Sequence, residues 1–390
     1  MPARTRSRAK TSQGSQKVMP SGVVSNYTNT EYSETCTDVI GDYGGDHTLS
    51  LDRYTRVVTP FTGDTKTSPT DSTYAGSYQN YWPTYPQSVA LSHMPVSGVP
   101  SNNQSAISAV ARSNPSKPSI DVLLALYELK DLPQLVRQVH MNLRALKFQG
   151  KPPVLRWTQT VAGNVLSFEF GIRPMLKDLQ TLVGFQSEIA KKFDQLDRLY
   201  NRGGIRYKSS PWNGSAYERI NVTADSSAGI VPAVVDRITT VSKWASVRWY
   251  PDPSAPRPTT DEQLLDLAQH AVFGREVTLD SLWNAVPYSW MVDWFSNMGE
   301  YLSTFRNTIP AKHSTPCVMT HTRTTYTGKV NRSSYPNLRG GDFVLTRETK
   351  SRALLPFLLP EANIGEVLNG RQVSILGSLG VSRIPRGILK

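Results

Sequence analysis

The sequence predicts an α+β protein that combines a helical bundle with an elongated antiparallel β-sheet region. Two observations lead to this fold class. Along the 390 residues, the spacing of apolar side chains alternates between period two and a helical period in five successive blocks. Only 38% of the residues are hydrophobic, which is low for a compact globule. We therefore expect a modest core, in which distant segments join to form the bundle and the sheet.

Three blocks of the chain are predicted to supply the sheet region: 18–118, 205–258 and 310–360. The first is rich in Ser, Thr, Gly, Pro and Tyr, and the second ends in the Pro-rich break "PDPSAPRP". Alternation of polar and apolar residues, which is typical of strands, is clearest at 47–58, 234–250, 317–330 and 342–355. Because helical blocks separate these stretches, the sheet must join parts of the chain that are far apart in sequence.

Two blocks, 119–204 and 259–309, are predicted to be helical and to complete the bundle. The helical spacing is clearest at 119–148, 175–200, 260–273 and 286–302. The glycines of "NRGG" are expected to end the helix near Tyr200. The remaining residues, 361–390, are expected to form a C-terminal tail with a short helix.

The net charge of the chain predicts a polyanionic partner. A charge of +12 and a pI near 9.6 favour nucleic acid or an anionic membrane surface over a neutral substrate. No apolar stretch approaches the roughly 20 residues that a bilayer-spanning helix needs. The first residues also lack the apolar segment of a secretory signal. Nucleic acid is therefore the favoured partner, and no membrane span is expected.

Residues 1–17 are expected to form a basic flexible arm. This segment carries five cations and no core-forming side chains, and the first acidic residue of the chain is Glu31. Such a composition is typical of disorder in the absence of a partner. The cations of the arm that we expect to contact RNA are Arg4, Arg6, Arg8 and Lys10.

A second basic surface is predicted on a helix of the expected bundle. Cations recur there at intervals of three and four residues beside an apolar stripe, and further cations follow. An ordinary solvated helix face is the alternative for any single stripe. The residues expected to bind RNA in this block are Arg137, His140, Arg144, Lys147, Lys151, Arg156, Lys191 and Lys192.

An aromatic stretch, "STYAGSYQNYWPTYPQS", lies among turn-forming residues and is expected to be a loop or an irregular edge. Its rings would be free to stack on unpaired RNA bases. A protein-contact loop, such as one that meets a receptor, is an equally good interpretation. The rings concerned are Tyr74, Tyr78, Tyr81, Trp82 and Tyr85.

The densest aromatic stretch, Val286–Leu302, predicts a helix buried against the bundle. On one helix its aromatic residues and Met298 share a stripe, whereas the opposite stripe is polar and acidic. A membrane-surface helix would carry Lys or Arg on that polar stripe. Asp293 would resemble a general acid if it were buried, but such a carboxylate is more often solvated or capping. The expected core residues of this region are Trp283, Trp290, Trp294 and Met298.

No arrangement of residues in the sequence predicts catalysis. The six histidines lack metal-ligand spacing, and HExxH, GxSxG and GxxxxGK[ST] do not occur. Cys36 and Cys317 are too few for a Cys-rich zinc site, and the sequence leaves open whether they form a disulfide. We expect no enzymatic activity, no metal site and no cofactor.

Two stretches resemble the maturation (A) protein family of the single-stranded RNA bacteriophages, the leviviruses. The first is "FEFGIRPMLKDLQTLVGF" at 168–185, with an aromatic-Gly-x-x-Pro pattern that includes Phe170 and Pro174. The second is "LWNAVPYSWMVDWFSNMGEYL" at 282–302, with a Val-Pro-aromatic-Ser-aromatic pattern followed by Val-Asp-Trp and a Gly. Their apolar residues are explained by helix packing, so both stretches are expected to mark the fold.

The resemblance implies a virion protein, present in one copy, that takes the place of a coat dimer. It implies binding of genomic RNA, especially hairpins near the 3′ end, by the bundle. It further implies that a long, curved sheet attaches the particle to a bacterial pilus, and that the protein enters the cell with the RNA after synthesis in the host cytoplasm. The alternative is a non-viral protein that binds structured RNA and has no receptor role.

Overall fold

The computed structural model describes residues 3–19, 21–39, 46–67, 75–83, 91–118, 185–226, 229–273, 278–286, 289–362, 372–376 and 378. The chain divides into two compact units. We call Met1–Ala106, Lys208–Ser246 and Thr315–Pro356 the sheet unit. We call Ile107–Tyr207, Val247–Ser314 and Phe357–Lys390 the helical unit.

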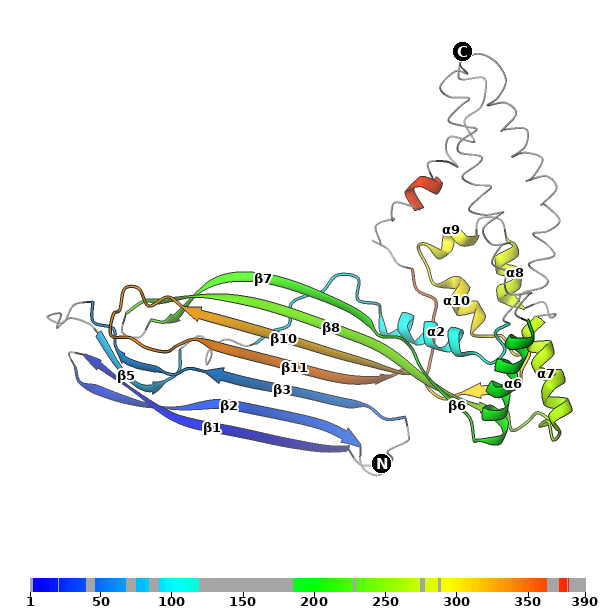
Figure 1. Cartoon of the computed structure of the whole chain (residues 1–390), viewed down its shortest axis with the longest axis horizontal. Coiled ribbons are helices and arrows are strands. Elements are labelled where there is room, and N and C mark those ends of the chain that lie inside the picture. The colour runs from blue at the N-terminus through cyan, green and yellow to red at the C-terminus, as the bar shows by residue number, and fades with distance from the viewer. Residues whose placement is uncertain are drawn as a thin grey trace, which may run out of the picture. The chain divides into compact units, whose positions relative to one another are not determined.

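The sheet unit is built from long antiparallel strands that lie side by side in the order β4-β5-β1-β2-β3-β11-β10-β8, with β7 also paired to β8 (Figure 1). Neighbours such as β3 and β11 are almost three hundred residues apart in sequence. The strands are β1 Ala3–Met19, β2 Val23–Val39, β3 Leu49–Val58, β4 Phe61–Asp64, β5 Ala75–Tyr81, β7 Trp212–Asp225, β8 Val231–Pro251, β10 Cys317–Val330 and β11 Phe343–Leu354.

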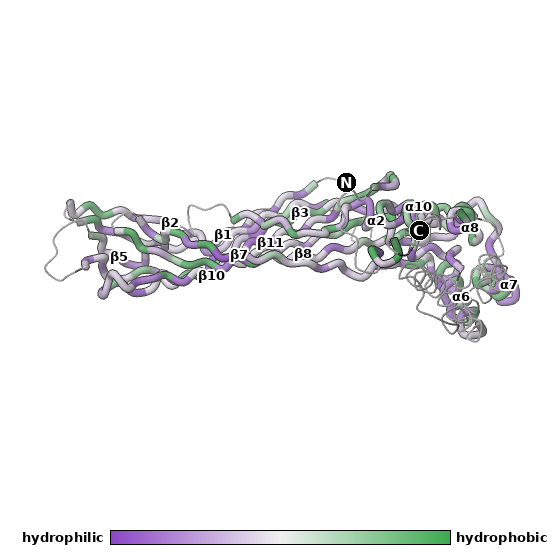
Figure 2. The backbone as a smooth tube through the Cα atoms, turned by 90° about the horizontal axis from the view of Figure 1, so that it is seen from above, coloured by the Kyte–Doolittle hydropathy of each residue, from purple (hydrophilic) through white to green (hydrophobic). Residues whose placement is uncertain are grey.

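Alternation of side chains explains why these segments form strands. In β8 buried and more exposed residues alternate over much of its length, and β10 is rich in Thr, which favours a pleated backbone. Figure 2 shows that hydrophilic and hydrophobic stretches both occur along the strands. The apolar positions gather in two core clusters, one around Phe61, Tyr78 and Val231 and the other around Leu91, Tyr326 and Leu345.

Residues 91–100 form a strap that is held on one face of the sheet. Leu91 is buried in the second cluster, and the next carbonyl, that of Ser92, accepts hydrogen bonds from Tyr326 and Arg237. His93 bonds through its two ring nitrogens to Thr324 of β10 (2.7 Å) and Thr349 of β11 (3.0 Å). Polar side chains therefore fix the strap across neighbouring strands.

The helical unit packs three helices around the end of β8. Val110 of α2, Leu196 and Leu199 of α6 and Leu264 of α7 share one buried cluster, which includes Trp249 of β8. Its elements are α2 Asn102–Ser113, which begins in the sheet unit, α6 Phe185–Asn201, α7 Asp261–Phe273, α8 Leu279–Ala285, α9 Ser289–Asp293 and α10 Met298–Ser303, with β6 Ile205–Lys208 and β9 Ala311–His313 paired to β8.

The structure confirms the α+β class and the assembly of one antiparallel sheet from distant segments. The alternating stretches predicted at 47–58, 234–250, 317–330 and 342–355 correspond to β3, β8, β10 and β11. α6 ends at "NRGG", where Gly203 and Gly204 have positive φ. Residues 372–376 are helical. The bundle itself stays a prediction, because 119–184 lie outside the described residues.

Three expectations differ from the structure. The flexible basic arm is wrong for residues 3–17, because they pair along their length with β2 as part of β1. The helix α2 lies in a block predicted to hold strands and loops, and Ser101 caps it by accepting a hydrogen bond from the Gln104 amide. The single helix predicted over 286–302 is divided into α9 and α10 by a turn.

Candidate nucleic-acid interface

One face of the sheet carries a row of alternating charges, which we call the charge row. The strand registers pair Arg8 of β1 with Glu34 of β2, and Glu34 with Arg53 of β3. They continue the row to Glu348 of β11 and Arg323 of β10. Opposite charges directly across neighbouring strands stabilise their register. The charge row therefore stabilises the pairing of the strands and also places charges on this face of the sheet.

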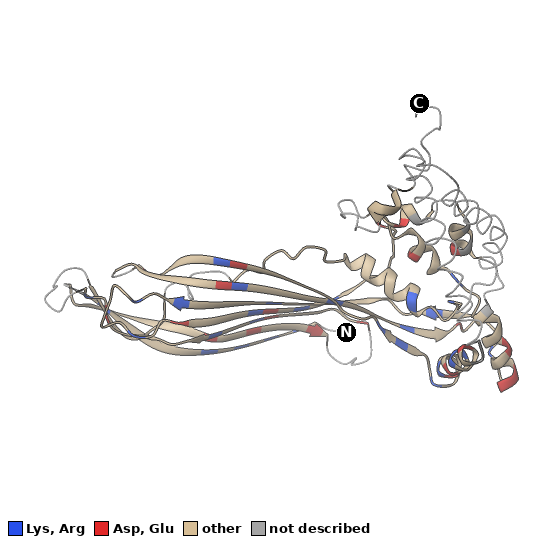
Figure 3. Cartoon of the chain, turned by 45° about the horizontal axis from the view of Figure 1, so that its top comes forward, with Lys and Arg blue, Asp and Glu red and all other residues tan. Residues whose placement is uncertain are grey.

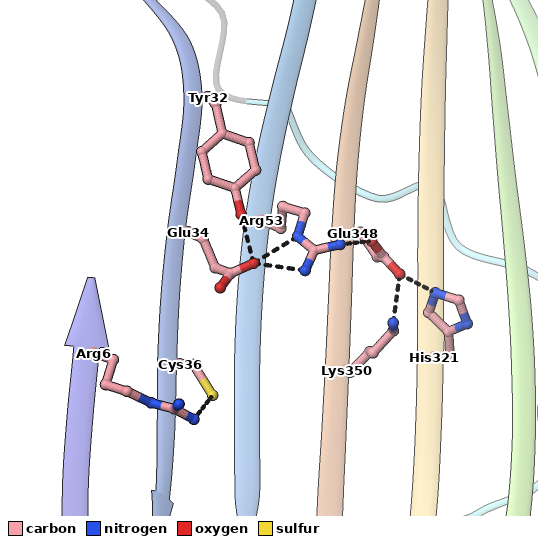
Figure 4. A network of polar contacts seen from close by, with 8 residues as sticks. All are labelled: Arg6, Tyr32, Glu34, Cys36, Arg53, His321, Glu348 and Lys350. Carbon is pink, nitrogen blue, oxygen red and sulfur yellow. Dashed lines mark hydrogen bonds and ion pairs between the residues drawn. The ribbon is translucent and has the colours of Figure 1, made fainter. Parts of the chain in front are cut away.

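Hydrogen bonds link the middle of the charge row to its neighbours (Figure 4). Arg53 lies between two carboxylates, with Nη2 at 2.6 Å from Glu34 and Nη1 at 3.2 Å from Glu348. The other oxygen of Glu348 is 2.9 Å from His321 Nε2 and 2.8 Å from Lys350 Nζ. Tyr32 donates a hydrogen bond of 2.7 Å to Glu34. Both carboxylates are thus enclosed by donors.

These contacts keep the carboxylates of the charge row ionised. Hydrogen bonds from Tyr32 and Arg53 lower the pKa of Glu34. Burial acts to raise the pKa of Glu348, but Lys350, His321 and Arg53 outweigh it and lower that pKa. Their negative charges offset the neighbouring cations, so only part of the formal positive charge of this face remains for a partner.

The cations predicted for the arm lie beside this row on β1. Arg4 and Arg6 both reach Asp38, at 2.7 and 2.9 Å, and Lys10 lies 2.6 Å from Glu31. Arg8 is exposed at the end of the charge row. Cations and acids are accordingly interspersed along the strands (Figure 3). The acidic partners of these cations lie on β2, after residue 30 of the chain. The ion pairs therefore depend on the β1–β2 register, which the composition of residues 1–17 does not reveal.

The helical unit contains a different basic region, the β8–β9 cluster, made of Arg248, Tyr250, Phe305, Lys312 and His313. The guanidinium of Arg248 lies 5.5 Å from the ring centroid of Tyr250, which pairs in register with Lys312. The side chain of Lys312 is 63% exposed and Phe305 is 55% exposed. Aromatic rings beside exposed cations are the chemical pattern that binds single-stranded nucleic acid. The sequence analysis did not select these residues. Local signals were nevertheless present: Pro251 follows Tyr250, Pro310 lies two residues before Lys312, and Phe305 comes shortly after the end of α10.

A tight turn after β8 positions the cluster. Asp252 accepts hydrogen bonds from the Ser254 amide (2.9 Å) and hydroxyl (2.6 Å), and Lys312 lies 3.1 Å from the same oxygen. Ser254, followed by Lys312, lowers the pKa of Asp252 to about 2. The carboxylate is therefore ionised at any physiological pH, and it holds β9 against the end of β8.

Two lysines predicted to bind RNA occupy different environments on α6. Lys191 is exposed and lies 2.7 Å from Glu188. Lys192 is buried and donates a hydrogen bond of 2.9 Å to the carbonyl of Lys117, and burial lowers its pKa to about 8. Lys192 therefore stabilises the fold and is withdrawn from the predicted interface. The other predicted residues of this group lie outside the described residues: Arg137, His140, Arg144, Lys147, Lys151 and Arg156.

The prediction of freely exposed rings is wrong for Tyr78, Tyr81 and Trp82, each at most 4% exposed. In a regular strand Tyr78 and Tyr81 would point to opposite faces. Asn80, with φ of 52°, and a register shift in the β4–β5 pairing break that alternation, so the two rings lie 5.2 Å apart in one core cluster. Tyr74 and Tyr85 lie outside the described residues.

Residues of the second motif contact one another. Asp293 accepts hydrogen bonds from Trp283 Nε1 (3.1 Å) and from the Gly299 amide (2.9 Å), which joins α8, α9 and α10. A Cβ at Gly299 would lie 2.7 Å from the Asp293 carboxylate. Asp293 therefore satisfies an amide in the first turn of α10 from outside that helix, whose N-cap residue is Asn297.

The residues predicted as core around this motif are less buried than expected. Trp283, Trp294 and Met298 are half-buried, and none of the α10 residues is fully buried. The side chain of Trp290 and the residues Phe170 and Pro174 lie outside what the structure describes.

Within the described part of the chain, no group of three or more His, Cys, Asp or Glu side chains is arranged to hold a metal ion. Cys36 and Cys317 are buried free thiols. None of the described helices is both long and apolar enough to cross a membrane.

Comparison with known proteins shows that part of this chain is similar to part of a viral protein. No protein-family model matches the chain. The chain is 27% identical over 191 residues to a protein named Maturation protein A2 from Qbeta virus (strain MX1). The aligned region covers 45% of this chain and 42% of that protein, so the chain matches less than half the length of this relative. The similarity indicates a distant relationship to that phage protein.

Proposed function

We propose that this chain is the maturation and attachment protein of a single-stranded RNA bacteriophage. In this role it binds the 3′-end hairpins of genomic RNA inside the virion, takes the place of one coat dimer and adsorbs the particle to a bacterial pilus. It then enters the cell with the genome. The observation that carries the proposal is the distant similarity to a protein named Maturation protein A2. The two motif stretches at 168–185 and 282–302 and the charge of +12 support it.

The proposal assigns different partners to the two units. RNA is assigned to cations of the helical unit, because the β8–β9 cluster places exposed rings beside exposed cations. The pilus is assigned to the sheet unit, whose broad strand face offers regularly spaced charges and exposed apolar side chains for contact with another protein. Exposed apolar residues of this unit include Val57, Tyr217, Ile238 and Val344.

This assignment moves Arg4, Arg6, Arg8 and Lys10 from the RNA surface to the proposed receptor surface. Arg4, Arg6 and Lys10 each lie within 3 Å of an acidic side chain of the neighbouring strand β2, so they hold the β1–β2 pairing of the sheet unit. We further propose that the protein acts by binding alone, as a single copy in each virion, without catalysis or a cofactor.

A non-viral protein that binds structured RNA is the second candidate. It is favoured by the limited extent of the similarity, which leaves more than half of the chain unmatched. Such a protein would share the basic charge but would have no pilus and no coat protein among its partners.

One experiment separates the two candidates. The protein is isolated under native conditions from the cells that produce it, and the RNA and proteins that copurify with it are sequenced and identified. The proposal expects one phage genome and a coat protein in the same particle, and expects particles that lack the chain to be non-infectious. A mixture of cellular RNAs without coat protein would support the second candidate instead.

A further inference from the structure

A hollow of about 360 Å³ lies in the helical unit beside the β8–β9 cluster. Its size falls at the lower end of the range for small-ligand sites, which suits a single planar ring system. Trp249, Phe305, Asn307, Lys312, His313 and Asp252 are among the residues that line it. The lining therefore combines two aromatic rings, an amide, an imidazole, the carboxylate of Asp252 and the cations of Lys312 and Arg306, of which Arg306 is paired with Asp280.

The aromatic lining is held in place before any ligand arrives. Trp249 is buried and donates a hydrogen bond of 2.8 Å from Nε1 to Ser113, while its ring meets His313 edge to face at 5.2 Å. Phe305 meets Tyr301 edge to face at 5.1 Å, yet it remains 55% exposed. An apolar ring that is fixed in position but left exposed favours stacking with a ligand.

The polar lining is suited to a nucleotide. His313 Nδ1 donates to the Ser314 carbonyl at 2.8 Å, which leaves Nε2 as the nitrogen for a ligand. Lys312 supplies a positive charge for phosphate, and Asn307 supplies an amide that both donates and accepts. The ionised Asp252 accepts hydrogen bonds, as the amino groups of a base require, and Lys312, which lies 3.1 Å from it, would be shared between this carboxylate and the phosphate.

We propose that this hollow binds one unpaired base of single-stranded or looped RNA, with Phe305 stacked on the base and Lys312 beside the adjoining phosphate. The inference deepens the proposed function and rests on it, since it names where RNA meets the helical unit. A paired base has both faces covered by its neighbours, so a double-stranded RNA would not occupy the hollow.

The test measures fluorescence anisotropy of the full chain with a short labelled single-stranded RNA and with a blunt-ended RNA duplex of the same length, which has no loop. Phe305→Ala should weaken binding of the single strand by roughly 5- to 150-fold, the range expected for loss of one stacked base. Phe305→Tyr should bind like the wild type. Phe357→Ala is the matched control, because Phe357 is 82% exposed in the same unit and does not line the hollow.

A second variant keeps the test decisive if Phe305→Ala has a lower melting temperature than the wild type. Lys312→Gln should lower the slope of log affinity against log salt by roughly 0.7 for the single strand. Equal affinities of the Phe305→Ala and Phe357→Ala proteins, or an unchanged slope in Lys312→Gln, would overturn the inference and leave the proposed function standing. Failure of the wild-type chain to bind any RNA would overturn both.

Discussion

The charge row and the β8–β9 cluster both concentrate cations, but they use them differently. In the charge row Arg53 lies between Glu34 and Glu348, and each carboxylate is enclosed by donors on its own and neighbouring strands. In the cluster the exposed cations Arg248 and Lys312 accompany a Tyr ring and a hollow. The charge row therefore uses charge to fix strand register, whereas the β8–β9 cluster places Arg248 beside a ring and Lys312, which also bonds to Asp252, beside a hollow.

The difference shows why net charge alone does not identify a nucleic-acid surface. A cation that is already hydrogen-bonded to a carboxylate must give up that contact, or share it, to bind phosphate. A cation beside an exposed ring gains stacking and electrostatic attraction together. The formal charge of +12 is a property of the whole chain, and the strand registers decide which part of it remains for a polyanion.

The largest effect is expected at Asp280, which supports the wall of the hollow. Asp280 forms an ion pair with Arg306, and their side chains are only 7% and 9% exposed. Asp280→Ala would leave the Arg306 charge buried without this partner, so the free energy of unfolding should fall by about 3–5 kcal/mol. Urea denaturation measures this change. Asp266→Ala is the control, because Asp266 of α7 is exposed. Equal losses of unfolding free energy in the two variants would contradict the account.

A smaller effect is expected at Glu348, where the charge row can be broken without touching the cluster. Glu348→Gln removes the charge that Arg53 and Lys350 share and to which His321 also bonds, and the free energy of unfolding should fall by about 1–3 kcal/mol. RNA affinity should not change, because the residue serves strand register. Glu218→Gln on β7, with its side chain 45% exposed, is the matched control. Loss of RNA affinity in Glu348→Gln would place RNA on the sheet instead.

The smallest effect is a pH dependence that is confined to the sheet unit. Burial, and next the charge of Arg347, lower the pKa of His93 below its ordinary value of 6.5, with Arg237 adding to this and Asp52 opposing it. The unfolded chain then takes up the proton more readily than the folded chain, so stability is fully present above pH 6.5 and decreases as the pH falls below it.

Chemical denaturation between neutral pH and pH 5 measures this decrease, in a window where most carboxylates are still ionised. His93→Gln removes the titrating group while keeping a side chain that can hydrogen-bond to Thr324, so its stability should vary less with pH. An identical pH dependence in the variant and the wild type would show that the strap does not respond to protonation.

The fold class was predictable because periodicity is a local property. β10 spans Cys317–Val330, as its alternation predicts, and the glycines after Asn201 end α6. The sequence could not predict that residues 3–17 form a strand, because the acids that match their cations lie on β2. Neither could it predict the break between α9 and α10, which depends on the contact of Asp293 with Gly299.

The candidate site was less predictable than the fold. Counting cations selected Lys192, which is buried, and counting aromatic residues selected Tyr78 and Tyr81, which fill a core. The β8–β9 cluster escaped notice because its residues come from three separate segments, which the β8–β9 pairing and the hollow lined by Phe305 bring together. Exposure and register are long-range properties, so composition selects the residue types of an interface but not their positions.

The measurement that tests the account most directly is the salt dependence of RNA binding by the full chain. We predict binding at low ionic strength and a linear fall of log affinity with log salt. In an Arg248→Ala and Lys312→Ala double variant the slope should decrease by roughly 1.4, the loss of two phosphate contacts, whereas Arg8→Ala with Arg323→Ala should leave it unchanged. Absence of RNA binding, or a greater loss of slope in the second double variant, would contradict the account.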